Sequence, residues 1–118
     1  MNKRILIIDD DQALCLLYQT ELKAAGYDVT SVHHVDDGLK SMAEVDYALV
    51  LLDIEMPEIS GLEALRELRE VAPDAKVILN SAYSEYKVDF TTWLADEYLI
   101  KSSDLQPLIE TIDRLLAV

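Results

Sequence analysis

The stretch ALVLLDIEMPEISG, residues 48–61, decides the fold of this chain. It opens with an uninterrupted apolar run, Ala48–Leu52, which is typical of a strand buried on both faces of a sheet. The run ends on Asp53, and a loop-like segment with proline and glycine follows. Aspartate is unfavourable in strands and costly to bury without a partner. Asp53 is therefore either a polar end to a strand or a residue held there for chemistry.

The composition predicts one soluble domain that spans residues 1–118. Its hydrophobic content of 51% is enough for a single core. The apolar run after Lys3 and Arg4 is too short for a signal peptide or a membrane span, so we expect a cytoplasmic protein without membrane contacts. The formal charge of −13 argues against direct binding to nucleic acid. Cys15 is the only cysteine, which excludes an internal disulfide and favours a small buried side chain.

Apolar runs alternate with helical patterns along the chain. Strands are predicted at residues 5–8, 27–32, 47–52, 77–79 and 98–100. Apolar residues at helical spacing predict helices marked by residues 14–25, 39–42, 62–68, 85–94 and 105–116. We expect Asp11 to cap the first helix, Gly26 to end it, and Asp36 to cap the second. Five such strand–helix units predict a parallel sheet with helices on both faces.

Ligands of such sheets bind at the carboxyl ends of the strands, and four of the five predicted ends carry polar groups. These groups are Asp9, Asp10 and Asp11 after the first strand, Asp53 after the third, Asn80 and Ser81 after the fourth, and Lys101 after the fifth. Singly, each has an ordinary explanation, such as a helix cap, a loop hydroxyl or a solvated charge. Their joint placement indicates a site. His33 and His34 follow the second strand, and we expect both to face solvent, because adjacent histidines cannot easily face one site.

The chemistry of such a cluster can be inferred from its charges. Two carboxylates ~4 Å apart repel by about 4 kcal/mol at an effective dielectric constant of ~20. Mg²⁺ relieves this repulsion, prefers oxygen ligands and retains sites for phosphate oxygens. A carboxylate can also attack a phosphoryl group to give an aspartyl phosphate, with Lys101 and Ser81 placed to meet the transferring oxygens.

Four segments, in this order, resemble the receiver domain of two-component response regulators. ILIIDDDQAL (5–14) resembles the first strand and its acidic pair, LVLLDIEMPEISGLEAL (49–65) the phosphoacceptor segment, VILNSAYSEY (77–86) the segment with the switch hydroxyl, and ADEYLIK (95–101) the segment with the lysine. The resemblance covers essentially the whole chain. It implies a doubly wound, flavodoxin-like α/β fold with a five-stranded parallel sheet of order 2-1-3-4-5 and five helices.

The resemblance also implies a function. A sensor histidine kinase or a phosphotransfer protein would phosphorylate Asp53, with Ser81 and Lys101 as the other catalytic groups. Mg²⁺ would be held by Asp9, Asp10, Asp53 and the backbone carbonyl of Glu55. Ser81 and Tyr98 would then switch a surface that selects an effector protein, an output domain or a second copy of the chain. Such a domain catalyses its own phosphorylation and dephosphorylation but is not a turnover enzyme.

The sequence departs from the family pattern in two places. Ser102 follows Lys101 where the family has a proline in a cis peptide, which leaves the isomer of this bond open. Leu94 stands where the family has a glycine that ends the fourth helix. We therefore expect that helix to end differently, with one of Trp93 and Leu94 in the core and the other exposed. Glu55 and Tyr83 flank the site and are expected to affect the lifetime of the phosphoryl group.

Two other functions remain open from the sequence. A degenerate receiver would only bind partner proteins, although the complete set of site residues argues against it. A small phosphohydrolase resembling dehalogenases would place its nucleophile after the first strand with a second aspartate two residues on, as Asp9 and Asp11 are spaced. That reading leaves Asp53 unexplained, and the chain has no room for a segment that covers the substrate.

Overall fold

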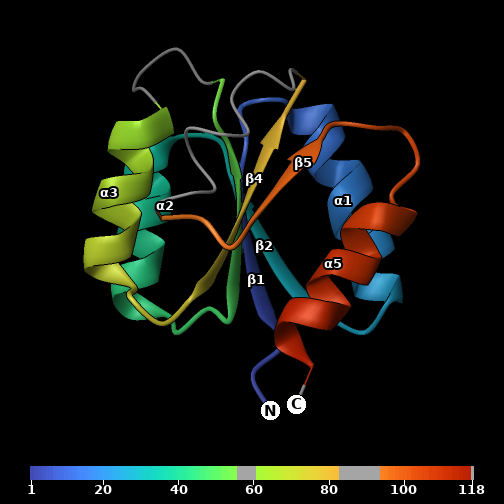
Figure 1. The fold of residues 1–118 in the computed structure, drawn as a ribbon, viewed down its shortest axis with the longest axis horizontal. Helices are drawn as coiled ribbons and strands as arrows, with labels where there is room; N and C mark the ends of the chain where they lie inside the picture. The colour runs from blue at the N-terminus through green and yellow to red at the C-terminus, as the bar shows by residue number, and fades with distance from the viewer. Residues whose placement is uncertain (56–60, 83–93, 118) are drawn as a thin grey trace.

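A computed structural model describes residues 1–55, 61–82 and 94–117. A five-stranded parallel sheet lies between two pairs of helices, with α2 and α3 on one face and α1 and α5 on the other (Figure 1). The strands are β1 (Arg4–Ile8), β2 (Asp28–Val32), β3 (Leu49–Asp53), β4 (Lys76–Ser81) and β5 (Glu97–Ile100). The helices are α1 (Gln12–Ala24), α2 (Val35–Glu44), α3 (Gly61–Val71) and α5 (Gln106–Leu116). The helix predicted over residues 85–94 lies outside the described residues, apart from Leu94.

The strand order is β2-β1-β3-β4-β5, and every neighbouring pair is parallel, which confirms the predicted doubly wound sheet. β3 lies in the centre and is buried along its whole length, as its apolar run predicts. The strand begins at Leu49 and includes Asp53, so the predicted bounds of 47–52 are shifted toward the carboxyl end. Asp53 is paired with Asn80 of β4, so the carboxylate stands inside the sheet edge and not in the loop beyond it.

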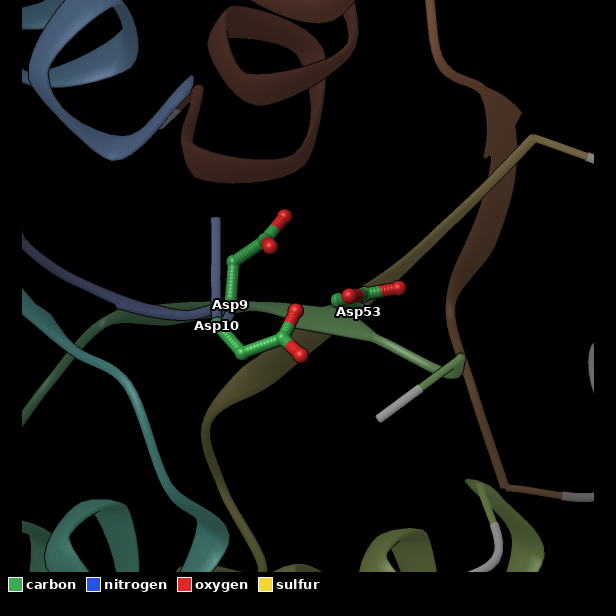
Figure 2. Close-up of side chains that lie close together, drawn as sticks. All are labelled: Asp9, Asp10 and Asp53. Carbon is green, nitrogen blue, oxygen red and sulfur yellow. The ribbon is translucent and has the colours of Figure 1, made fainter. Parts of the chain in front are cut away.

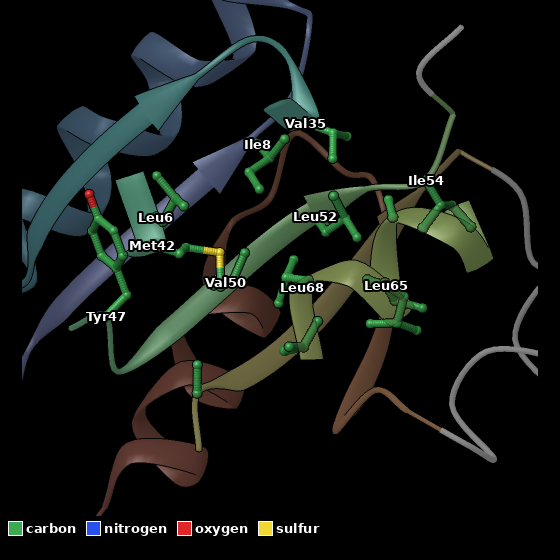
Figure 3. Close-up of a cluster of buried hydrophobic side chains, with 14 of the residues drawn as sticks. Leu6, Ile8, Val35, Met42, Tyr47, Val50, Leu52, Ile54, Leu65 and Leu68 are labelled. Carbon is green, nitrogen blue, oxygen red and sulfur yellow. The ribbon is translucent and has the colours of Figure 1, made fainter. Parts of the chain in front are cut away.

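Side chains alternate between the two faces of each strand and form one apolar cluster on each face. The cluster under α2 and α3 includes residues 6, 8, 50, 52, 65, 68, 77 and 79 (Figure 3). The cluster under α1 and α5 includes residues 5, 7, 18, 22, 49, 51, 78, 108 and 112. The apolar stripes predicted for α3 and α5 therefore do form the core, apart from Leu62, whose side chain lies outside the described part.

The ends of the helices confirm two of the three predicted caps. Asp11 accepts a hydrogen bond from the backbone N–H of Leu14 at 3.1 Å, as an N-cap does. Gly26 follows α1 with a φ of 100°, a conformation that glycine adopts without strain. The cap predicted at Asp36 is wrong, because α2 already begins at Val35, whose side chain is buried in the core. Asp36 instead lies in the first helical turn, where a negative charge is favourable.

The two departures from the family pattern have simple structural outcomes. The peptide bond between Lys101 and Ser102 is trans. Leu94 does not adopt a positive φ; it is half-buried and packs against the cluster under α2 and α3. The guanidinium of Arg69 fixes this segment by donating to the carbonyl of Leu94 at 2.6 Å and pairing with Asp96 at 2.8 Å. Trp93 lies outside the described residues.

No helix in the described part of the chain combines the length and the apolar character that a membrane crossing requires.

Candidate functional site

Three carboxylates meet at the carboxyl edge of the sheet. Asp9 and Asp10 follow β1, Asp53 ends β3, and their side chains converge (Figure 2). One oxygen from each carboxylate lies within 4.8 Å of the others. The cause is the topology: β1 and β3 are parallel neighbours with Ile8 opposite Leu52, so the residues that follow lie side by side. Asp9 and Asp53 are buried, whereas Asp10 is exposed.

Lys101 supplies the positive charge that faces these carboxylates. Its Nζ lies 3.3 Å from Oδ2 of Asp9 and 3.4 Å from Oδ1 of Asp53. The backbone N–H of Lys101 donates to the carbonyl of Ser81, which ties the end of β5 to the end of β4. Burial lowers the pKa of Lys101, but the charges of Asp9 and Asp53 outweigh this effect and raise it. The ammonium is therefore charged at neutral pH.

Asp53 is held in an environment that disfavours its charge. Burial, together with the nearby charge of Asp9, raises the pKa of Asp53 to about 6, against the opposing effects of Lys101 and of a 3.0 Å hydrogen bond from the Glu55 N–H. The single positive charge of Lys101 therefore does not neutralise the negative charge of the three carboxylates. The cluster favours a further cation, and the donor set is entirely oxygen, as Mg²⁺ prefers.

Ser81 and Glu55 form a second contact at the same edge. Ser81 is the last residue of β4 and is fully buried. Its hydroxyl donates to Oε1 of Glu55, and the backbone N–H of Ala82 donates to the same oxygen at 2.7 Å. The family resemblance implied a metal-binding role for the backbone carbonyl of Glu55, and Glu55 was expected to flank the site and affect the lifetime of the phosphoryl group, which stays a prediction. No sequence pattern indicated that its side chain would reach across to β4.

Asn80 does not join the acidic cluster, although it stands at the same strand end. Its Nδ2 donates to the hydroxyl of Tyr18 on α1 at 2.7 Å. Asn80 and Ser81 are consecutive in a strand, so their side chains point to opposite faces. Burial raises the pKa of Tyr18, which keeps this hydroxyl neutral. The pair is a structural link between α1 and β4.

The expectation that both histidines face solvent is wrong for His33. His34 is exposed, but His33 is half-buried, and its Nδ1 lies 3.0 Å from the backbone carbonyl of Asp9. The reason is that β2 lies beside β1, so the residue after β2 meets the residue after β1. Cys15 is buried as predicted, and burial, with the charges of Asp9 and Asp11, raises its pKa to about 11.

Tyr98 is 3% exposed and belongs to the cluster under α2 and α3. Its ring is therefore already inside the protein in this structure, and the role of Tyr98 in a switch stays a prediction. Tyr83 lies outside the described residues.

Comparison with known proteins agrees with this geometry. The model of the response regulator receiver domain matches residues 5–113. The response regulator protein TrrA from Thermotoga maritima, solved in complex with Mg²⁺-BeF, is 44% identical, with 97% of this chain and 99% of that chain covered and a TM-score of 0.89. In a second structure, of histidine kinase ThkA in complex with TrrA, the matching chain is 43% identical, with 98% and 99% covered and a TM-score of 0.88.

Curated relatives are longer than this chain. The transcriptional regulatory protein YkoG of Bacillus subtilis is 39% identical over 111 residues, which are 92% of this chain and 48% of that protein. ZraR of Salmonella typhimurium is 34% identical over 115 residues, which are 96% of this chain and 26% of that protein. The chain thus spans between a quarter and a half of the length of these two relatives. The match over residues 5–113 and the close structural likeness show that the chain belongs to the receiver domain family of response regulators.

Proposed function

We propose that this chain is a phosphoacceptor switch whose acceptor is Asp53. The observation that carries the proposal is the placement of this buried carboxylate, 3.4 Å from the Lys101 ammonium and beside the acidic pair Asp9 and Asp10. The arrangement provides a nucleophile and a cation for the transferring oxygens in one place. The structure of the relative TrrA in complex with Mg²⁺-BeF supports the same assignment.

The residues fit a divalent cation. Three carboxylates converge within 4.8 Å, and among the described residues only Lys101 forms an ion pair with them. Mg²⁺ would be held by the carboxylates of Asp9, Asp10 and Asp53 and by the backbone carbonyl of Glu55. When bound, it would neutralise charge on Asp53 and on the phosphoryl oxygens, which is the main requirement of phosphoryl transfer.

The transfer step follows from these positions. A carboxylate oxygen of Asp53 attacks the phosphorus of a phosphohistidine, so that an O–P bond forms and the N–P bond breaks. The electron pair of the broken bond stays on the imidazole nitrogen, which leaves as neutral imidazole because its other nitrogen carries a proton. The Lys101 ammonium binds one phosphoryl oxygen, and the Ser81 hydroxyl binds another once it has left Glu55. In the second half of the cycle, the oxygen of a water molecule forms a bond to the phosphorus as the bond to Asp53 breaks, so that Asp53 returns to a carboxylate and the released inorganic phosphate carries a proton from the water.

The partners follow from the same proposal. The phosphodonor is a histidine kinase or a phosphotransfer protein, as the complex of ThkA with TrrA suggests by analogy. The longer relatives carry additional chain beyond the matched segment. This additional chain supports the proposal that an output domain or an effector protein responds to the phosphorylated domain. The proposed switch would link Ser81, which lies at the site, to Tyr98 in the neighbouring strand β5.

Intact-protein mass spectrometry after incubation with acetyl phosphate and Mg²⁺ tests the proposal. We expect one phosphoryl adduct that requires Mg²⁺ and is absent in Asp53→Asn. Asp11→Asn is the matched control, because it makes the same chemical change at a carboxylate that caps α1 and is not one of the three that converge, and it should be phosphorylated like the natural chain. No adduct in the natural chain, with either acetyl phosphate or a kinase, would favour a degenerate receiver. Release of phosphate from many phosphomonoesters would favour a hydrolase.

A further inference from the structure

An anionic group already occupies two hydrogen-bond donors of the site. Oε1 of Glu55 accepts from the hydroxyl of Ser81 and, at 2.7 Å, from the backbone N–H of Ala82. The same residue donates its backbone N–H to Oδ1 of Asp53 at 3.0 Å. Glu55 thus touches the proposed acceptor with its backbone and the end of β4 with its side chain. A carboxylate oxygen between two converging donors is bound as an oxyanion is bound.

Neither donor can form a full hydrogen bond to a second anion while it is bound to Glu55. A serine hydroxyl has one hydrogen to donate, and a backbone N–H also has one. A phosphoryl group on Asp53 would need the Ser81 hydroxyl, which faces the same edge of the sheet. It would also bring negative charge next to the carboxylate of Glu55, and like charges repel strongly where burial reduces screening. The carboxylate therefore has to leave before these donors can bind a phosphoryl oxygen.

We propose that Glu55 is an internal competitor for the phosphoryl group, and that its side chain determines how readily the site is occupied. The proposal rests on the function proposed above and adds to it a residue that opposes occupancy. The donor-bound state of Glu55 reduces the competent fraction of the protein, and the apparent affinity for a phosphoryl mimic falls by that fraction. A charge-assisted hydrogen bond is commonly worth about tenfold in an equilibrium constant, so removal of the competitor should strengthen binding by about tenfold.

Three variants separate the contact from other effects of the charge. Glu55→Ala removes both the charge and the contact. Glu55→Asp keeps the charge, but its side chain is one methylene shorter and cannot reach both donors from the same backbone position. Glu70→Ala is the matched control, because Glu70 is exposed at the carboxyl end of α3, away from the site. Glu55 is half-buried and Glu70 is exposed, so the three variants should fold.

Two measurements on each protein give the test. Calorimetric titration with beryllofluoride in the presence of Mg²⁺ gives the dissociation constant for a phosphoryl mimic. The backbone amide resonance of Ala82, recorded without any ligand, reports the Glu55 contact directly. We expect the dissociation constant to fall about tenfold in Glu55→Ala and Glu55→Asp, and the Ala82 resonance to shift upfield in both. Glu70→Ala should match the natural chain in both measurements.

The outcomes distinguish this inference from the proposed function. Equal dissociation constants for the natural chain and Glu55→Ala would overturn the inference and leave the phosphoacceptor function standing. Tighter binding without a shift of the Ala82 resonance would overturn the contact as the cause. If no protein in the set binds beryllofluoride, the proposed function fails and the inference fails with it. Binding by Glu55→Ala where the natural chain shows none would support both.

Discussion

Replacing Asp53 by asparagine should stabilise the metal-free protein at neutral pH. The folded environment raises the pKa of this carboxyl to about 6 from an ordinary value of 3.8, chiefly because the group is buried. Each pKa unit corresponds to about 1.4 kcal/mol, so holding Asp53 ionised in the folded state at pH 7.5 costs about 3 kcal/mol. Asparagine has nearly the same shape and no charge, and its carbonyl can still accept the N–H of Glu55. The variant should therefore be more stable by up to about 3 kcal/mol.

The sign of the pH dependence follows from the same shift. The folded state holds the Asp53 proton more tightly than the unfolded state, so unfolding releases a proton between pH 4 and pH 6. The favourable contribution of the protonated carboxyl is complete below about pH 4 and is lost as the pH rises through about 6. The gap in stability between the variant and the natural chain should accordingly be near zero at pH 4 and reach its full size above pH 7.

Urea unfolding at pH 4.0 and pH 7.5, with a chelator present, measures this gap. Asp74→Asn is the control, because Asp74 is exposed and precedes β4, at the opposite edge of the sheet from Asp53. Its effect should stay within about 0.5 kcal/mol at both pH values. Addition of Mg²⁺ should stabilise the natural chain and narrow the gap, since a bound cation compensates the charge that asparagine removes.

Two results would refute the electrostatic reasoning. One is an Asp53→Asn protein that is no more stable than the natural chain at pH 7.5. The other is a gap of the same size at both pH values, which would point to packing and not to charge. Equal slopes of free energy against urea concentration are needed for the comparison, because they show that the unfolded states expose similar surface.

Three further results can be predicted for residues outside the site. Gly38→Val should lower the free energy of unfolding by about 2 kcal/mol in urea melts, because a β-carbon at this position would lie 2.5 Å from Cδ1 of the buried Ile8; an unchanged midpoint would show that the helix can shift. Arg69→Met should cost about 2 kcal/mol in the same assay, because it leaves two carbonyls, including that of Leu94, without their donor. The thiol of Cys15, with its pKa raised to about 11, should react with a disulfide reagent only as fast as the protein opens, and a fast reaction in the folded protein would contradict its burial.

The sheet and the acidic cluster could be predicted because they follow from patterns that burial imposes. An uninterrupted apolar run ending in Asp53 is typical of a strand buried on both faces, and β3 is indeed buried throughout. Polar residues at the ends of parallel strands meet at one edge, which brings Asp9 and Lys101 to Asp53 from distant parts of the chain. The bounds of the strands were less predictable, because Asp53 belongs to β3 through its pairing with Asn80 of β4, a neighbour that is distant in the sequence.

Other features of the site were harder to predict, because they depend on the direction in which individual side chains point. The separation of Asn80 from Ser81 could have been anticipated from the alternation of side chains along a strand. The position of His33 required knowing that β2 pairs with β1, which follows only from the complete topology. The contact of the Glu55 side chain with Ala82 cannot be predicted from a periodic sequence pattern. The rotamer of a loop residue depends on the partners that the tertiary fold brings near it.

The strand order also determines when a newly synthesised chain can assemble the acidic site together with Lys101. β5 lies at the edge of the sheet beside β4 and is synthesised after all other strands. Until it docks, the carboxylates of Asp9 and Asp53 have no ammonium between them, and their mutual repulsion opposes closure of the sheet edge. A nascent chain on the ribosome, or a fragment without its last strand, would therefore present the acids without the ammonium of Lys101. Under the function proposed above, such incomplete chains should accept phosphoryl groups poorly, because the positive charge that meets the transferring oxygens arrives with the last strand.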